Sequence, residues 1–284
     1  MSHDTYFINL DRVPERAEFM HEQFARAGIE QAIRHRAVDA HACTGPISDR
    51  YAPHNWGPYW EMTPTEVAVM ESHRAIWQRV RESRRVSAIF EDDVLLAQSA
   101  GKTIADLSGN SADYDLIKLD ALAGTVRLGR KKTVHGHDLR PITHVLPSAA
   151  AYLITPKAAE NLLYRSQAYC DHLDDFITRP SPGFRAYQLS PAIAVQGMFA
   201  DLSGLNGIDV LVQGSERTGS EAQKSRPDRG PVPYRLAKEL RRAGRRLGRR
   251  LWRDRALTNA GGYIGEVALT GDLPPYCQSG MRSG

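Results

Sequence analysis

The sequence predicts an α/β fold with a mostly parallel central sheet, and two stretches carry this prediction. Residues 5–10 and 33–38 have the pattern of strands that flank an amphipathic helix, which is the start of a βαβ unit. Further along, the apolar run 86–90 has the composition of a strand buried on both faces of a parallel sheet. Three carboxylates follow that run directly, namely Glu91, Asp92 and Asp93.

This acidic triplet is the first candidate site, because ligands of open α/β sheets bind at the carboxyl ends of strands. Three adjacent negative charges repel one another, and removing them from water costs free energy. A bound divalent cation compensates for both effects, since Mg²⁺ and Mn²⁺ prefer carboxylate and phosphate oxygens as ligands. The triplet therefore predicts a metal-assisted site for an anionic, phosphorylated substrate.

Composition places the chain among soluble globular proteins, with 284 residues, of which 42% are hydrophobic and 25% charged. Its cysteines, Cys43, Cys170 and Cys277, are too few and too far apart to predict a disulfide framework or a zinc site, so a reducing compartment is expected. Neither a secretory signal nor an apolar stretch of membrane-spanning length is visible. We expect a cytoplasmic protein, peripheral on the inner face of the cell membrane if its C-terminal segment binds lipid.

The first helix is expected to begin near Asp11, to carry Pro14 in its first turn and to end at Gly28. The turn before this helix, at residues 9–16, is placed to receive a nucleotide. Arg16 either faces a base or phosphate there or is a solvated helix arginine.

A long loop is predicted at residues 39–62, which are rich in Pro, Gly, His and Tyr. Its aromatic side chains either stack on a sugar or base or pack the loop onto the body. A capping box, with Thr63 at the cap and Glu66 three residues later, then opens a helix that runs to about residue 83. His73 lies on the inward face of this helix, either as a core histidine or as a ligand contact.

Three later stretches complete the predicted body. Residues 115–120 have the pattern of a buried strand, in which Lys118 either meets a phosphate or pairs with an acid of the site. Residues 121–145 are expected to form an irregular hairpin or an insertion on the acceptor side. Residues 148–154 are predicted to be a strand of small side chains, and a further strand is expected near residues 187–189.

Seven sequence blocks across roughly residues 5–197 carry a resemblance to a known family. They are Phe7–Arg12 with Pro14–Arg16, Arg36–Asp39, Glu66–Trp77, Phe90–Val94, Ala150–Ile154, Cys170–His172 and Gln188–Pro191. In these blocks the chain resembles glycosyltransferase family 25, which includes bacterial lipooligosaccharide galactosyltransferases and relatives that glycosylate collagen. The resemblance implies a GT-A fold, a Rossmann-like α/β domain that binds a nucleotide-sugar and holds a divalent metal through an acidic motif.

The resemblance also implies roles for individual residues. Asp93 would coordinate the metal, most often manganese and alternatively magnesium, Glu91 would face the ribose, and Asp92 would support either. Asn9 and Arg16 would line the nucleoside pocket. The full set of candidates for nucleotide-sugar binding is Asn9, Arg16, Asp39, His73, Glu91, Asp92 and Lys118.

The family is described as inverting, which implies direct displacement by an acceptor hydroxyl and a carboxylate that acts as general base. Asp171 is the candidate, with Asp174 and Asp175 as competing carboxylates. The implied reaction is transfer of galactose or glucose from a UDP-sugar to a saccharide or lipid-linked saccharide acceptor, in lipopolysaccharide or surface-glycan synthesis. The alternatives are a metal-dependent hydrolase of phosphorylated substrates and a non-catalytic protein that binds glycans or nucleotides.

The C-terminal part has a different composition. The expected organisation is a glycosyltransferase domain over residues 1–213, a flexible linker over 214–233, and a basic amphipathic helix with its tail over 234–284. Residues 234–255 contain ten Lys or Arg and two acids, a net charge of +8, whereas the whole chain is formally +4. A leucine stripe runs along this helix, which is therefore expected to bind an anionic membrane, to pack on the acidic body or, least favoured, to bind nucleic acid.

Overall fold

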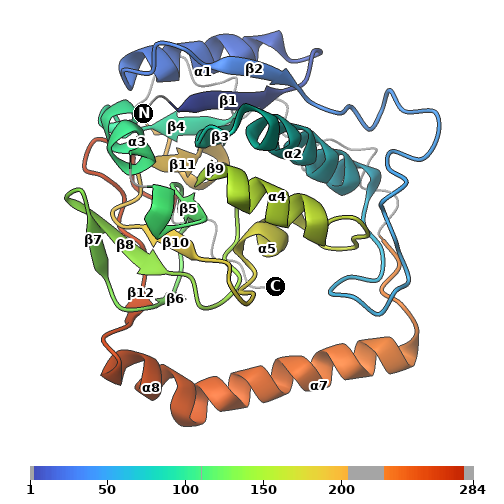
Figure 1. Cartoon of the computed structure of the whole chain (residues 1–284). Helices are drawn as coiled ribbons and strands as arrows, with labels where there is room; N and C mark the ends of the chain where they lie inside the picture. Colours follow the sequence, from blue (N-terminus) through green and yellow to red (C-terminus); the bar gives the residue numbers. More distant parts are fainter. Residues whose placement is uncertain (1–2, 110, 204–226, 278–284) are drawn as a thin grey trace.

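The computed structural model describes residues 3–109, 111–203 and 227–277, and its centre is an eight-stranded sheet with the order β2-β1-β3-β9-β5-β10-β8-β7 (Figure 1). The strands of this sheet are β1 Asp4–Asn9, β2 Ile33–Arg36, β3 Ser87–Glu91, β5 Leu116–Lys118, β7 Lys132–Val134, β8 His137–Pro141, β9 Ala151–Ile154 and β10 Ala186–Leu189. Two short ladders accompany it: β4 Val94–Leu96 with β11 Ala194–Gln196, and β6 Val126–Leu128 with β12 Tyr263–Gly265.

The central sheet is mixed, although most of its strands point the same way. β1 is parallel to β2 and β3, and β5 is parallel to β10. β9 lies antiparallel between β3 and β5, and β8 is antiparallel to both β10 and β7. The α/β class and the large sheet agree with the sequence prediction, whereas the direction of β9 could not be read from its run of small residues.

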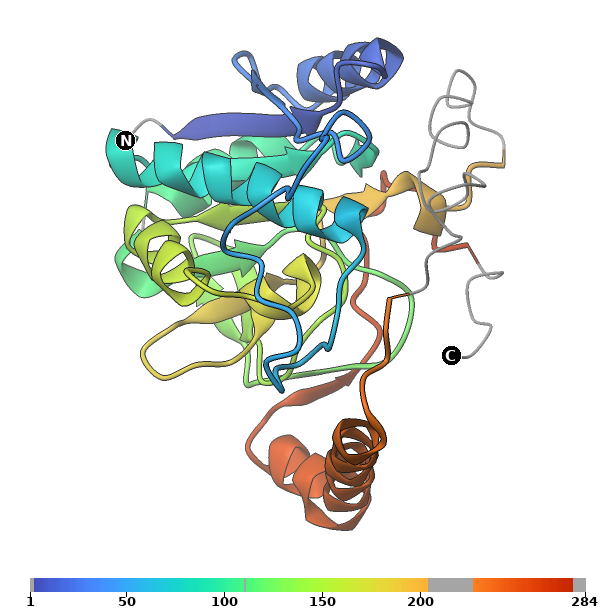
Figure 2. The ribbon, with the colours of Figure 1, turned by 90° about the vertical axis from the view of Figure 1, so that its right-hand side faces the viewer.

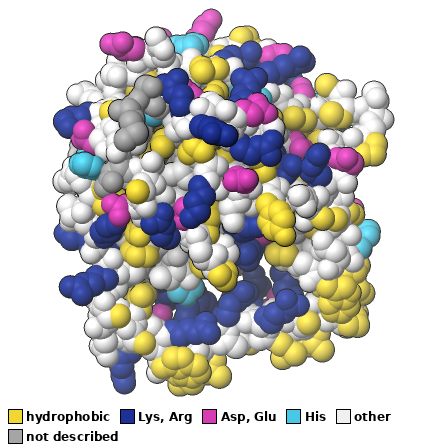
Figure 3. Space-filling model, in the orientation of Figure 1, with side chains coloured by type: hydrophobic (Ala, Val, Ile, Leu, Met, Phe, Trp, Pro, Cys, Tyr) yellow, Lys and Arg dark blue, Asp and Glu magenta, His cyan; other side chains and the backbone are white. Residues whose placement is uncertain are grey.

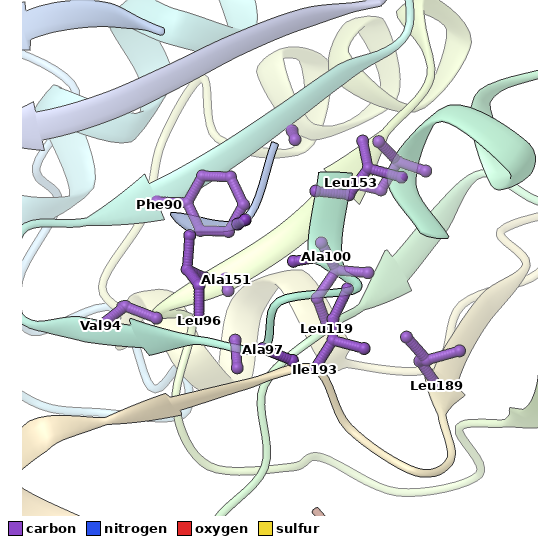
Figure 4. Packing of buried hydrophobic residues seen from close by; sticks show 14 of the residues in the cluster. Phe90, Val94, Leu96, Ala97, Ala100, Leu119, Ala151, Leu153, Leu189 and Ile193 are labelled. Carbon is purple, nitrogen blue, oxygen red and sulfur yellow. The ribbon is translucent and has the colours of Figure 1, made fainter. Parts of the chain in front are cut away.

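Helices cover both faces of the sheet, as Figure 2 shows from the side. They are α1 Pro14–Arg26, α2 Pro64–Ser83, α3 Ala100–Ser108, α4 Pro156–Arg165 and α5 Leu173–Thr178. Two clusters of buried side chains lie between the helices and the sheet, one on each face. α1 and α3 contribute to one cluster, and α2, α4 and α5 contribute to the other. Along β3, Phe90 belongs to the first cluster, shown in Figure 4, and Ile89 to the second. This strand is buried on both faces, as its apolar run predicts.

The two N-terminal helices begin in different ways, α2 at a side-chain cap and α1 without one. α2 has the predicted capping box, since Thr63 accepts a hydrogen bond from the backbone of Glu66 and the Glu66 carboxylate accepts one from the Thr63 backbone. α1 begins at Pro14 after Val13, later than the predicted start near Asp11. Gly28, at φ +70°, follows the end of α1 in a conformation that glycine adopts without strain.

Residues 121–145 do form a hairpin, but they also extend the central sheet. β7 and β8 make the hairpin, and β8 pairs with β10. β6 pairs instead with β12 from the C-terminal segment, whose residues Val267 and Leu273 are buried in the body. Of the two alternatives raised from the sequence, the hairpin is confirmed by β7 and β8. The pairing of β8 with β10 was not predicted, because a short polar strand has no distinctive sequence pattern.

The C-terminal helices lie along one side of the body (Figures 1 and 2). α7 spans Val232–Gly248, a π-helical turn follows at Arg249–Arg253, and α8 spans Asp254–Asn259. Of the predicted linker, residues 214–226 lie outside the described part of the chain, and residues 232 and 233 already belong to α7. None of the described helices is both long and apolar enough to cross a membrane.

Candidate functional site

A pocket lies where β1 and β3 end side by side, with Ile8 of β1 paired to Glu91 of β3. The pocket is lined by residues from both strand ends, α1, the segment after β2, α2, α5, the end of β11 and the turn after β11. They include Asn9, Arg16, Val38, His73, Glu91, Asp92, Asp93, Asp174, Gln196 and Met198. The parallel pairing of β1 and β3 therefore brings Asn9 and the acidic triplet together at one edge of the sheet.

Asp92 is the member of the triplet that ties the pocket to α1. Its carboxylate accepts hydrogen bonds from Asn9 Nδ2 at 2.8 Å and from Arg16 Nη1 at 3.1 Å. Burial raises the pKa of Asp92 above its ordinary value, and the positive charge of Arg16 acts against this rise. Asp92 thus fixes the two residues that were predicted to line a nucleoside pocket.

Arg16 lines the pocket, and only one of its three guanidinium nitrogens, Nη1, is paired with Asp92. Its side chain is only 9% exposed, and Nε and Nη2 are buried with no hydrogen-bond partner among the described residues. Leaving such donors unpaired costs free energy, because they have lost their water. A ligand with anionic or carbonyl oxygens in this pocket would relieve that cost. The alternative of a solvated arginine does not hold.

Glu91 and Asp93 are connected through a residue more than a hundred positions along the chain. The amide of Gln196 donates from Nε2 to Glu91 Oε2 at 3.0 Å and to Asp93 Oδ2 at 3.1 Å. Gln196 is held there because β11 pairs antiparallel with β4, which places it opposite Val94. Sequence reasoning missed Gln196, and no local signal marks it, since only the pairing of β4 with β11 brings it to the triplet.

The donor set around Asp93 fits a divalent cation that arrives together with a diphosphate. Carboxylates are the hard oxygen ligands that Mg²⁺ and Mn²⁺ prefer, and Gln196 holds the two together through its amide nitrogen. Within the described ranges, no group of three or more His, Cys, Asp or Glu side chains is arranged to hold a metal on its own. Such ions are commonly bound by one or two carboxylates, with substrate phosphates supplying further ligands. The chain therefore offers part of a coordination shell.

His73 is both a buried histidine and part of the pocket wall. Its Nδ1 lies 2.8 Å from the hydroxyl of Tyr152, which in turn accepts a hydrogen bond from Trp77 Nε1 at 2.8 Å. Burial lowers the pKa of His73 to about 3, so the ring is neutral at physiological pH. With the Tyr152 hydroxyl donating to Nδ1, the proton is on Nε2, which lies 3.9 Å from Glu91 Oε1. His73 can then donate a hydrogen bond on the side of Glu91.

The three candidate base residues lie around α5 in different surroundings. Arg179 donates to both oxygens of Asp171 at 2.8 to 3.1 Å, and Asp171 is buried outside the pocket lining. Asp175 accepts a hydrogen bond from the Tyr59 hydroxyl at 3.1 Å. Asp174 lines the pocket and accepts a hydrogen bond from the Ser148 backbone at 3.0 Å. Of the three, Asp174 is the one that the structure brings to the acidic triplet.

Two further candidates lie away from the pocket surface. Lys118 is buried and forms an ion pair by donating to Asp120 Oδ1 at 2.6 Å, but Asp120 is not an acid of the pocket. Asp39 accepts a hydrogen bond from Arg12 Nε at 3.0 Å, and its chain neighbours Val38 and Ala40 line the pocket. Asp39 therefore lies next to the pocket wall, whereas Lys118 stabilises the interior of the sheet.

Comparison with known proteins identifies the family of this chain. Residues 2–177, more than half of the chain, match the family model described as "Glycosyltransferase family 25 (LPS biosynthesis protein)". A Drosophila melanogaster protein named "Glycosyltransferase 25 family member" is 35% identical over 123 residues, which are 39% of this chain and 20% of that protein. The match thus spans a fifth of the relative's length. The family match includes α1, the acidic triplet and the candidate aspartates of α5, and the chain belongs to glycosyltransferase family 25.

Proposed function

We propose that this protein is a metal-dependent inverting glycosyltransferase that moves a hexose from a UDP-sugar to a saccharide acceptor. One observation carries the proposal. A single pocket contains an arginine with unpaired buried donors, Arg16, and a carboxylate pair suited to a divalent cation, Glu91 and Asp93. A nucleoside diphosphate is a ligand that satisfies both features at once. The proposed sugar is galactose or glucose, and the description of the family as lipopolysaccharide biosynthesis proteins supports a lipopolysaccharide or related glycan as the acceptor.

The nucleotide half of the donor is proposed to lie against β1 and α1. Arg16 Nε and Nη2 would donate to its phosphate or carbonyl oxygens, while Nη1 stays on Asp92. Asn9 Nδ2 is already used by Asp92 and by the Val13 backbone, so Asn9 would shape the pocket and position Asp92. The apolar side chains of Val38 and Met198 form part of the wall.

Asp93 and Glu91 are the residues that would hold the metal, with Gln196 keeping their carboxylates in register. When bound, a divalent cation neutralises the charge that develops on the departing nucleoside diphosphate. The chain contributes the geometry, because β3 fixes the backbone of Glu91 and the β4–β11 ladder fixes Gln196. Manganese and magnesium both fit this oxygen-rich set.

The base that accepts the proton of the acceptor hydroxyl is proposed to be Asp174. It lines the same pocket as the metal-binding carboxylates, and α5 projects it from the side of the sheet that α2 and α4 cover. A general base must come within hydrogen-bond reach of the proton that it removes. Asp171 is buried in its ion pair with Arg179 and would then act as a positioning residue for α5.

A donor panel tests this proposal. The full chain is incubated with UDP-galactose, UDP-glucose and other UDP- and GDP-hexoses in Mn²⁺, with and without a chelator, and release of the nucleoside diphosphate is measured. We expect turnover with a UDP-hexose that the chelator abolishes and that a saccharide acceptor accelerates. If no donor is turned over and no donor binds, with or without metal, the proposed activity is excluded.

A further inference from the structure

α7 exposes a continuous stripe of large apolar side chains. Leu236, Leu240, Leu247 and Leu251 are each more than half exposed, and Trp252 beside them is 57% exposed. These leucines recur at helical spacing, so they lie along one side of the helix. In Figure 3 hydrophobic side chains lie along the lower edge of the molecule, where Figure 1 has α7. A soluble surface rarely leaves such a stripe uncovered.

The opposite side of α7 contacts the body. The hydroxyl of Tyr234 donates to the backbone oxygens of Gly57 and Pro58 at 3.1 and 3.2 Å. The ammonium of Lys238 lies over the ring of Tyr59, 4.6 Å from its centre. Tyr234 and Lys238 are one turn apart, on the side of the helix away from the leucines. The packing alternative raised from the sequence thus applies to this side and leaves the leucine stripe uncovered.

Basic side chains surround the stripe. The segment 234–255 carries a net charge of +8. In Figure 3 dark blue Lys and Arg side chains lie between the apolar edge and the body. Glu239 and Asp254 pair with Arg242 and Arg127 respectively. The two acids of the segment are therefore already engaged, and the arginines determine the field around the leucines.

We propose that an anionic lipid bilayer covers this surface, with α7 lying in the plane of the membrane interface. An amphipathic helix with leucine and tryptophan on one side and arginine on the other has the composition of an interfacial helix. Anionic headgroups complement the arginines, and the acyl boundary takes up the leucines. A second copy of the chain would bring two arginine arrays together, which repel. A nucleic acid would use the arginines and leave the leucines in water.

Contacts between α7 and the body lead to α5, the helix that carries Asp174. Residues 57–59 contact α7, and the Tyr59 ring stacks on His172 at 3.8 Å. The Tyr59 hydroxyl also donates to Asp175 of α5, the helix that carries Asp174. A membrane-bound α7 is thus linked through one tyrosine to the pocket wall. The membrane proposal itself rests on α7 alone and does not depend on the proposed reaction.

Binding of the full chain to vesicles tests the proposal. Sedimentation is compared for vesicles of phosphatidylcholine alone and for equal mixtures of phosphatidylcholine and phosphatidylglycerol, at low and high salt. We expect binding to the anionic vesicles that weakens with salt. Leu240→Asp should lower it by about tenfold or more, and so should the pair Arg241→Glu with Arg245→Glu. All three positions are exposed, so the variants should fold, which circular dichroism checks.

Matched controls keep the test specific. Tyr164→Asp changes an equally exposed apolar residue on α4, and Arg26→Glu with Arg81→Glu makes the same charge change on α1 and α2. Both controls should bind vesicles as the wild type does. If Leu240→Asp binds the vesicles as strongly as the wild type, the proposal is overturned, because binding would then depend on charge and not on the leucine stripe. A wild-type dimer that Leu240→Asp converts to a monomer would also overturn it, because a second copy would then cover the stripe. No nucleotide is present, so failure here is distinct from failure of the proposed reaction.

Discussion

The guanidinium of Arg16 donates from Nη1 to Oδ1 of Asp92 at 3.1 Å, so that the first helix is joined to the end of β3. The same guanidinium keeps Nε and Nη2 buried with no hydrogen-bond partner among the described residues. Arg16 therefore serves the fold through one nitrogen, and two further donors stay unpaired in a residue that lines the pocket. This division explains why Arg16 is buried although it carries a charge.

Replacing Arg16 should weaken nucleotide binding more than it weakens the fold. Arg16→Lys keeps a positive charge near Asp92 but removes the planar fork. We expect UDP affinity to fall roughly tenfold or more, since a hydrogen bond from a charged group contributes about 1.5–3 kcal/mol. Calorimetric titration with UDP measures this loss, with Arg26→Lys at the other end of α1 as control. Equal affinities for Arg16→Lys and the wild type would show that the spare donors do not touch the nucleotide.

Gln196 offers a test of how the carboxylate pair is held. Gln196→Met removes the amide that bridges Glu91 and Asp93. We expect the Mn²⁺ concentration for half-maximal turnover to rise by about 10–100-fold, the range found when groups that orient metal ligands are removed. Metal titration of turnover provides the measurement, and Gln167→Met at an exposed position is the control. An unchanged Mn²⁺ requirement would mean that Gln196 does not organise the metal-binding carboxylates.

Asp174 and Asp171 should differ in what their loss changes. Asp174→Asn is expected to lower kcat by about 10²–10⁴-fold, the usual contribution of a general base, with UDP affinity unchanged. Asp171→Asn should weaken the ion pair with Arg179 and lower kcat by a smaller factor than Asp174→Asn does. Steady-state kinetics together with UDP titrations separate the two variants. If Asp171→Asn loses all activity and Asp174→Asn keeps it, Asp171 and not Asp174 is the general base.

The Asp171 carboxyl should leave a signature in the pH dependence of stability. Burial raises its pKa in the folded protein from 3.8 to about 6, while Arg179 acts in the opposite direction. The folded state then binds more protons than the unfolded state between these values. The contribution of Asp171 to the free energy of unfolding is therefore full below about pH 4 and is lost as the pH rises to about 6.

The size of this effect is about 3 kcal/mol for a rise in pKa from 3.8 to about 6. Denaturant unfolding at pH values from about 4 to 7 measures it as the difference between the wild type and Asp171→Asn. The difference in unfolding free energy between the two proteins should change by about 3 kcal/mol as the pH rises from about 4 to about 6. It should stay constant above about pH 7. A constant difference over the whole range would show that Asp171 is ionised throughout in the folded protein.

Local patterns allowed much of the fold to be predicted. The capping box of α2, the buried strand β3 and the acidic triplet each depend on residues that are close in the sequence. The inward position of His73 follows from helical spacing alone. The basic amphipathic pattern of residues 234–255 likewise predicts a helix, which the structure shows as α7. The helix starts at Val232, inside the expected linker.

Pairing between distant segments could not be predicted from those patterns. β9 runs antiparallel between β3 and β5, and its small residues suit either direction. Gln196 reaches the triplet only through the β4–β11 ladder. Asp171 was the first candidate base from the sequence, yet Arg179, eight residues later, takes both of its oxygens. Such contacts depend on how the elements pack, which a single sequence does not display.

The central claim is that the acidic triplet binds a nucleotide together with a metal, and the Mn²⁺ dependence of UDP affinity tests it most directly. Calorimetric titrations of UDP are compared with Mn²⁺ and with chelator, for the wild type and for Asp93→Asn. We expect Mn²⁺ to tighten UDP binding by roughly tenfold or more in the wild type and to have little effect in Asp93→Asn. UDP binding that responds equally to Mn²⁺ in both proteins would contradict the assignment of the metal site to Asp93.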